Sequence, residues 1–151
     1  HEPPTFEGYK DNIAKILRRL KTETAASIAI LSLPLISEDI GHTVNRLGDQ
    51  YSDYLREVAR QMDVEYLPLR EKQKEYLRGR SRRAKYTYDD TFRLLMVGVV
   101  YYLLGISWDK MADMNGNQLS VDNIHSNTCA AQMIAELVED FIQRHSKLQP
   151  A

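Results

Sequence analysis

Residues 27–34, Ser-Ile-Ala-Ile-Leu-Ser-Leu-Pro, form a continuous apolar run that a proline ends. A bounded run of this length is typical of a strand buried on both faces, as in a parallel sheet. A second run, Val64-Glu-Tyr-Leu-Pro-Leu69, predicts another strand, which ends at Pro68 or lies at an edge. Between the runs, residues 42–62 predict a helix whose apolar face holds Val44, Leu47, Tyr51, Tyr54, Leu55, Val58 and Met62. Strand, helix and strand in this order predict a right-handed βαβ unit.

Helices are predicted on both sides of this unit. They share apolar residues at helical spacing or capping residues at their ends. These helices span residues 5–22, 71–78, 89–104 and 107–116, and a last one starts at Asn127. Two strands are too few for a parallel sheet that stands alone, because such a sheet needs cover on its faces and edges. We therefore expect an α/β fold that is the second half of a larger layered structure.

The composition fits one soluble globular domain. The chain has 151 residues, of which 27% are charged and 43% are hydrophobic. Its net charge of −1 gives no field that draws it to nucleic acid, so we expect no nucleic-acid partner. A single cysteine, Cys129, excludes an internal disulfide and is interpreted as a small packed side chain. The sequence starts at His1 rather than Met, so we expect a partial product and leave the cellular location open.

An acid stands three residues before a histidine in Ser120-Val-Asp-Asn-Ile-His125, just ahead of the last predicted helix. A carboxylate at this spacing can accept the imidazole Nδ1–H, fix the tautomer and leave the other ring nitrogen to take a proton. Asp122 and His125 are therefore candidates for the acid–base half of a serine hydrolase triad. The alternative interpretation is an Asx-type turn and a helix-start histidine that have no chemistry.

The two apolar runs, Asp122-Asn-Ile-His125 and the helix after it resemble the GDSL-type SGNH hydrolases, which are serine esterases and acylhydrolases. The resemblance implies a flavodoxin-like three-layer αβα fold, present here in part with about two parallel strands and several helices. It implies that residues 1–151 are the C-terminal part of one domain, with a helical insertion over residues 71–117. On this resemblance Asp122 orients the ring, His125 is the general base, and neither a metal nor an organic cofactor is needed.

The chain departs from that family in its other motifs. The Gly-Asp-Ser block with the nucleophile, the glycine of the second block and the Gly-x-Asn-Asp of the third are absent. We expect all three in a missing N-terminal segment, so this chain alone should be inactive toward a small-molecule ester, and self-association of the isolated piece is a further hypothesis. Within the chain, Ser120 and Ser126 are weaker candidates for the nucleophile, since Ser120 shares a face with the acid and Ser126 suits a helix cap.

A rival interpretation is a non-enzymatic α/β module that binds a protein partner or a membrane surface. It would use the apolar helix over residues 92–104, which we otherwise interpret as core or as a wall for an acyl chain. The basic loop would take part through Arg78, Arg80, Arg82, Arg83 and Lys85. A solvated loop is the alternative there. His42 and His145 lack a second ligand at metal spacing, so no metal site is predicted.

Overall fold

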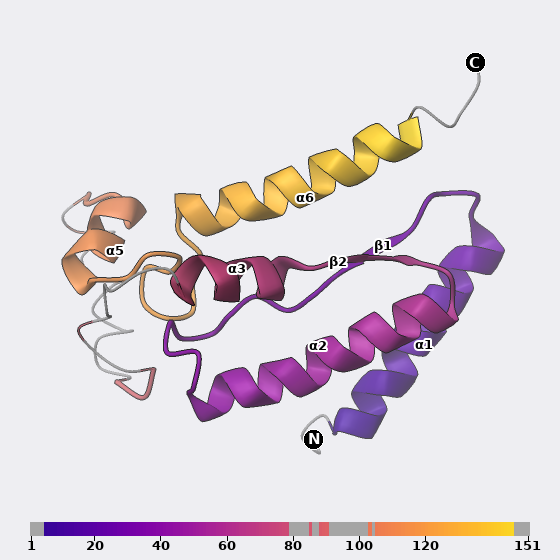
Figure 1. Ribbon diagram of the computed structural model, residues 1–151, viewed down its shortest axis with the longest axis horizontal. Coiled ribbons are helices and arrows are strands. Elements are labelled where there is room, and N and C mark those ends of the chain that lie inside the picture. Colours follow the sequence, from indigo (N-terminus) through magenta and orange to yellow (C-terminus); the bar gives the residue numbers. More distant parts are fainter. Residues whose placement is uncertain (1–4, 79–84, 86–87, 91–102, 104, 147–151) are drawn as a thin grey trace.

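The computed structural model describes residues 5–78, 85, 88–90, 103 and 105–146, and the fold is built from these. Their elements follow in the order α1 (Phe6–Glu23), β1 (Ala29–Leu31), α2 (Thr43–Gln61), β2 (Glu65–Leu67), α3 (Leu69–Arg78), α5 (Trp108–Asn115) and α6 (Thr128–Ser146). Figure 1 shows α1 and α2 along one side of the strand pair and α6 along the other. The chain is thus mostly helical around a small parallel sheet.

The two strands pair as the apolar runs predict. β1 and β2 are parallel, with Ala29 opposite Glu65 and Leu31 opposite Leu67, and α2 connects them. This confirms the βαβ order. Each strand has only three residues, and β1 is half-buried rather than buried on both faces. The expectation of full burial was wrong because the described sheet has two strands, so each keeps an unpaired edge.

Capping side chains begin the helices where the sequence predicts them. Thr5 Oγ1 accepts the amide of Gly8 at 3.1 Å, and Asn127 Oδ1 accepts the amide of Ala130 at 3.1 Å. Ser107 caps α5 in the same way. α3 begins at Leu69, two residues before the predicted start, because Pro68 ends the strand and a helix can follow a proline at once.

The hydrophobic core lies between the end of β1, α3 and α6. Its buried residues are Leu35, Leu69, Leu77, Leu119, Ala130 and Met133. The predicted apolar face of α2 contains one error, since Leu47 is 53% exposed. Asn45 and Ser52 are buried on this helix instead. The inner surface of α2 is therefore partly polar, and its partner is the charged side chain of Arg70.

Several predictions fall outside the described residues. Only Leu103 of the apolar helix at 92–104, and only Arg78 and Lys85 of the basic loop, have described positions. The helical insertion over residues 71–117 stays a prediction, although α3 and α5 fall mostly within it. In the described part of the chain, no helix has the length and hydropathy that a membrane crossing requires.

Candidate acid–base site

Asp122 and His125 are in direct contact. Asp122 Oδ2 lies 2.7 Å from His125 Nδ1, and Asp122 Oδ1 accepts the backbone amides of Ile124 at 3.0 Å and His125 at 2.8 Å. Asp122 is 1% exposed, whereas the His125 side chain is 57% exposed. A buried carboxylate with three donors is fixed in place, so it holds an exposed imidazole in one orientation.

The loop that carries this pair closes on itself. The amide of Val121 donates to the carbonyl of His125 at 2.7 Å, and Ser120 pairs with Ser126 in an isolated antiparallel bridge. Asn123 takes a left-handed conformation with φ of 71°, which asparagine tolerates better than most residues. The Asx-type turn expected as an alternative is present, and the same carboxylate also binds the ring. The turn and the contact between the acid and the histidine are therefore present together.

The chemistry available here is proton transfer at one ring nitrogen. Because Asp122 occupies Nδ1, the other nitrogen, Nε2, is the one that can exchange a proton with a bound molecule. Among the described residues, Nε2 of His125 has no hydrogen-bond partner. The indole of Trp108 meets the ring edge-on, with centroids 5.5 Å apart and planes at 79°. This contact limits rotation of the ring while leaving more than half of the side chain open.

Glu38, in the loop after β1, anchors the chain just ahead of Asp122, and sequence reasoning missed it. Its carboxylate accepts the amides of Gln118 at 2.8 Å, Leu119 at 2.7 Å and Ser120 at 2.9 Å. The Ser120 hydroxyl donates to the same carboxylate at 3.2 Å. The two segments are about eighty residues apart, so no local pattern in the sequence reveals the contact.

The other end of the loop is tied to the short helix α5. Asp109 Oδ1 accepts the amide of Thr128 at 3.0 Å, and Oδ2 accepts its hydroxyl at 2.7 Å. These hydrogen bonds lower the pKa of Asp109 below its ordinary value. Asn115 Nδ2 donates to the carbonyl of Val121 at 2.9 Å. Contacts from both sides therefore hold the segment that bears the acid and the histidine.

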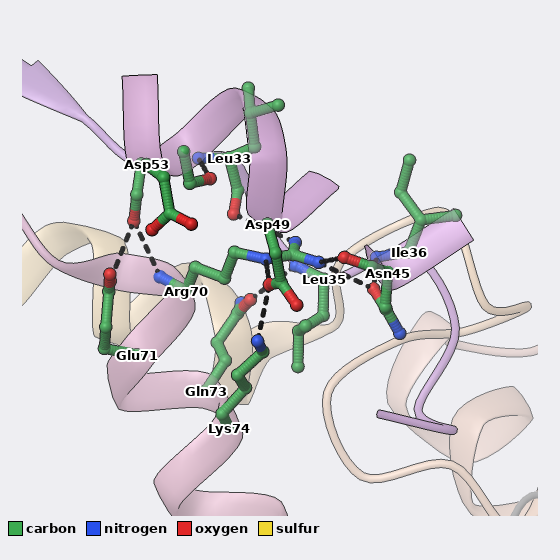
Figure 2. A network of polar contacts seen from close by, with 12 residues as sticks. Leu33, Leu35, Ile36, Asn45, Asp49, Asp53, Arg70, Glu71, Gln73 and Lys74 are labelled. Atoms are coloured by element: carbon green, nitrogen blue, oxygen red, sulfur yellow. Dashed lines mark hydrogen bonds and ion pairs between the residues drawn. The ribbon is translucent and has the colours of Figure 1, made fainter. Parts of the chain in front are cut away.

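A second charged cluster surrounds Arg70 and belongs to the architecture (Figure 2). Arg70 Nε donates to Asp49 Oδ1 at 2.6 Å, Nη1 to the Pro34 carbonyl at 2.9 Å, and Nη2 to both oxygens of Asn45. Its side chain is 3% exposed. Asn45 continues the network, because its amide nitrogen donates to the carbonyl of Ser37 at 2.9 Å. The network fixes the loop that presents Glu38.

An open cleft of about 340 Å³ lies beside Arg70, between α2 and α3. Its charged side chains are Asp49, Asp53, Arg56, Arg70, Glu71, Lys74 and Arg78. Arg56 contacts both Asp53 and Glu71, and Lys74 contacts Asp49. Most of the charge is thus neutralised internally, and neither Asp122 nor His125 lines the cleft.

The contacts of the two serines near the site differ from those of a catalytic nucleophile. Ser120 is buried, and its hydroxyl is bound to Glu38 and accepts the amide of Asn123 at 3.2 Å. Ser126 is exposed and pairs with Ser120 through its backbone. The geometry therefore assigns Ser120 to the support of the loop.

The remaining candidates have structural contacts. Cys129 packs against the core, as expected for a small apolar side chain. His42 caps α2 through Nδ1 and lies 3.3 Å from Asp89 through Nε2. His145 Nδ1 lies 2.9 Å from the Phe141 carbonyl. The described residues contain no group of three side chains that suits a metal ion.

Comparison with known proteins identifies the fold. No family model matches the sequence, and no curated protein matches it. LAE5, an alpha/beta hydrolase enzyme from the metagenome of Lake Arreo, Spain, is similar over 99% of this chain and 50% of its own, with a TM-score of 0.58 and 18% identity.

Axe2, an acetylxylan esterase from Geobacillus stearothermophilus, gives the second comparison. An arginine mutant of Axe2 has a TM-score of 0.58 and 12% identity, over 92% of this chain and 46% of that one. A catalytic mutant with a histidine replaced by alanine has a TM-score of 0.56 and 11% identity over the same shares. The chain spans about half the length of these proteins. At such identities the likeness concerns the fold alone, which is α/β and similar to about half of the fold of LAE5 and of Axe2.

Proposed function

We propose that this chain carries the acid–base half of a serine ester hydrolase of the GDSL type in the SGNH group, acting on carboxylic esters. The observation that carries the proposal is the 2.7 Å contact between buried Asp122 and the exposed ring of His125. A carboxylate bound to Nδ1 stabilises the imidazolium that forms when Nε2 takes a proton. The position of this pair, just before α6 and beside the loop after β1, suits a site at the carboxyl end of the sheet.

In this mechanism a serine hydroxyl from another stretch of polypeptide attacks the ester carbonyl. His125 Nε2 takes the hydroxyl proton as the Oγ–carbon bond forms, and the tetrahedral intermediate collapses as His125 returns that proton to the leaving alcohol. Water then attacks the acyl-enzyme with the help of the same nitrogen, which releases the acid and restores the serine. Asp122 stays ionised and bound to Nδ1 throughout.

The nucleophile and the oxyanion-hole donors belong, in this proposal, to an N-terminal segment outside residues 1–151. No serine of the described part of the chain makes a hydrogen bond to His125, which agrees with a hydroxyl supplied from elsewhere. We therefore propose that the chain alone does not turn over esters, and that the missing segment completes the three-layer αβα fold.

The structural neighbours support ester chemistry of this type. One Axe2 neighbour is described as a catalytic mutant with a histidine replaced, and another as a catalytic mutant with a serine replaced. Because both compared structures of this group are named for acetyl ester cleavage, an acetyl ester is a reasonable first probe. The rival role as a binding module stays an untested prediction, because the helix and loop that it needs lie largely outside the described residues.

The test is hydrolysis of p-nitrophenyl acetate by the polypeptide that carries both the serine and residues 1–151. We expect His125→Ala to lower kcat/KM by at least about a hundredfold, since general base catalysis contributes about 10²–10⁴-fold. His145→Ala is the matched control, because this histidine lies on α6 and contacts Glu65 and Phe141 rather than the loop.

Two results would contradict the proposal. Unchanged hydrolysis in His125→Ala would remove His125 from the mechanism. Turnover by residues 1–151 alone that depends on His125 would retain ester hydrolysis but overturn the claim that the nucleophile lies elsewhere, and Ser126→Ala would then identify the hydroxyl.

A further inference from the structure

The loop that bears Asp122 and His125 is held by a charge that lies far away in the sequence. Glu38 accepts three consecutive amides, those of Gln118, Leu119 and Ser120, at 2.7 to 2.9 Å. Hydrogen bonds to an ionised acceptor are about twice as strong as neutral ones. Three consecutive N–H groups that converge on one carboxylate fix the backbone of these residues, which end two positions before Asp122.

A second contact from the same loop reaches beyond the acid. The amide of Ser37 donates to the carbonyl of Asn123 at 2.7 Å. Ser37 and Asn123 both have positive φ, at 74° and 71°. Strained backbone of this kind persists only where neighbouring contacts determine it. The loop after β1 therefore holds the turn around Asp122 from both sides.

Side chains of α2 and α3 hold the loop after β1 in place. Asn45 donates to the carbonyls of Ser37 at 2.9 Å and Asp39 at 2.8 Å, so it brackets Glu38. Arg70 in turn binds both oxygens of Asn45. A continuous series of hydrogen bonds thus connects the buried guanidinium with the segment that carries His125.

We propose that Glu38 is a positioning residue for His125, which acts through the amides of residues 118–120. It sets the place of Asp122 and hence the orientation and tautomer of the imidazole. The inference rests on the proposed function for its catalytic meaning, but its structural content concerns the chain alone. A carboxylate suits this task better than an amide, since it only accepts hydrogen bonds and all four groups that face it are donors.

The experiment uses the full polypeptide that includes residues 1–151, with nitrogen-15 in the histidine rings, at pH 8, where an ordinary imidazole is neutral. The side-chain nitrogen shifts report which ring nitrogen of His125 carries the proton. We expect the Nδ1–H form to predominate in the wild type, because Asp122 accepts that hydrogen. Glu38→Ala should lose this preference and give a mixture of tautomers.

Two further variants separate positioning from general stability. Glu38→Gln keeps the size and one good acceptor, so it should restore part of the Nδ1–H preference. Asp39→Asn changes the neighbouring acid, whose carboxylate binds only the amide of Gly41 among the described residues, and should leave the ring as in the wild type. Amide spectra of α1 and α2 show whether each variant is folded.

A folded Glu38→Ala with the wild-type tautomer would overturn the inference. If Glu38→Ala does not fold, the test depends on Glu38→Gln. The full wild-type preference for the Nδ1–H tautomer of His125 in Glu38→Gln would then contradict the inference. The outcomes also separate this inference from the proposed function. If the tautomer depends on Glu38 but hydrolysis is unchanged in His125→Ala, the positioning role stands and the proposed enzyme function is rejected. If the tautomer does not depend on Glu38 but hydrolysis is lost in His125→Ala, only the role of Glu38 is rejected.

Discussion

Two pairs of acid and base in this molecule have nearly the same contact distance and opposite surroundings. Asp49 lies 2.6 Å from Arg70 Nε, and Asp122 lies 2.7 Å from His125 Nδ1. The Arg70 side chain is 3% exposed and donates to carbonyls and side chains on several sides. The His125 side chain is 57% exposed, and only one of its nitrogens is occupied among the described residues.

The difference in exposure separates a pair that holds the fold together from a pair that can exchange a proton. A guanidinium whose donors are all taken cannot bind a further group without breaking the fold, and it does not release its proton at ordinary pH. An imidazole with one nitrogen held and the other open can bind and release a proton while its support stays fixed. The contact distance alone does not distinguish the two pairs, whereas the ring nitrogen that remains open on His125 does.

The largest expected effect tests the open pair. In the polypeptide that carries the serine, Asp122→Asn should lower kcat/KM for ester hydrolysis by about 10³–10⁴-fold, because the amide selects the wrong ring tautomer. The fold should survive, since the remaining carbonyl oxygen can still accept the amides of Ile124 and His125. Asp53→Asn, an exposed acid on α2, is the control for loss of a charge. Activity near the wild type in Asp122→Asn would mean that Asp122 only forms a structural turn.

The next effect tests the closed pair. Arg70→Met removes the guanidinium and keeps the aliphatic stem, so the carbonyls of Pro34 and Asn45 lose their donor inside the protein. A buried acceptor left without its donor costs about 1–3 kcal/mol, so we expect the loss at these two carbonyls to lower the free energy of unfolding from urea denaturation by about 2–6 kcal/mol. Arg60→Met is the control, because Arg60 pairs with Glu57 on the surface and should change stability by less than about 1 kcal/mol. Equal losses in the two variants would mean that burial does not determine how much Arg70 contributes to the free energy of unfolding.

A glycine on α2 sharpens the same contrast. A Cβ at Gly48 would lie 2.7 Å from Nη2 and 2.9 Å from Cζ of Arg70, and this guanidinium has no room to move. Helix propensity favours alanine by about 1 kcal/mol, yet we expect Gly48→Ala to destabilise the protein by about 1–3 kcal/mol through this clash.

The matched test of the clash is a double-mutant cycle. In the Arg70→Met background the clash with the guanidinium is gone, so Gly48→Ala should become neutral or stabilising. Gly8→Ala on α1, where only the exposed Thr5 hydroxyl comes close at 3.2 Å, should be nearly neutral. The same destabilisation by Gly48→Ala in both backgrounds would exclude Arg70 as its cause.

The smallest expected effect is a pH dependence of stability at Asp49. Burial opposes ionisation of this carboxyl, but hydrogen bonds from Arg70 and Lys74 outweigh it and lower its pKa below the ordinary value. The unfolded chain therefore binds the proton more tightly. Stability is full above the unfolded-state pKa of about 3.9 and is lost as the pH falls through the lower folded-state pKa. Asp49→Asn should flatten the slope of unfolding free energy against pH in that window. An unchanged slope would mean that other acids cause the pH dependence.

The sequence predicts those parts of the molecule that depend on neighbours along the chain. The caps at Thr5 and Asn127, the pairing of two apolar runs and the contact of Asp122 with His125 all join residues that lie close together or repeat with a fixed period. The βαβ order follows from the same local patterns. These features are set by backbone geometry over a few residues, so their pattern is visible without coordinates.

The parts that sequence reasoning missed depend on contacts between distant segments. Arg70 and Glu38 look like ordinary surface charges, and nothing near them indicates burial or the amides of residues 118–120. Apolar periodicity predicts a buried Leu47 because it ignores polar partners, and in the structure Asn45 takes the inner position and binds Arg70. Nothing in the sequence around Gly48 indicates that this glycine makes room for the guanidinium.

The central claim is that His125 activates a serine hydroxyl which another stretch of polypeptide supplies. Its most direct measurement is the rate at which a fluorophosphonate labels that serine in the polypeptide that includes residues 1–151, compared between the wild type and His125→Ala. Rapid labelling that falls at least about a hundredfold in His125→Ala is the expected result. Equal labelling rates in the two proteins, with the label on the same serine, would contradict the claim.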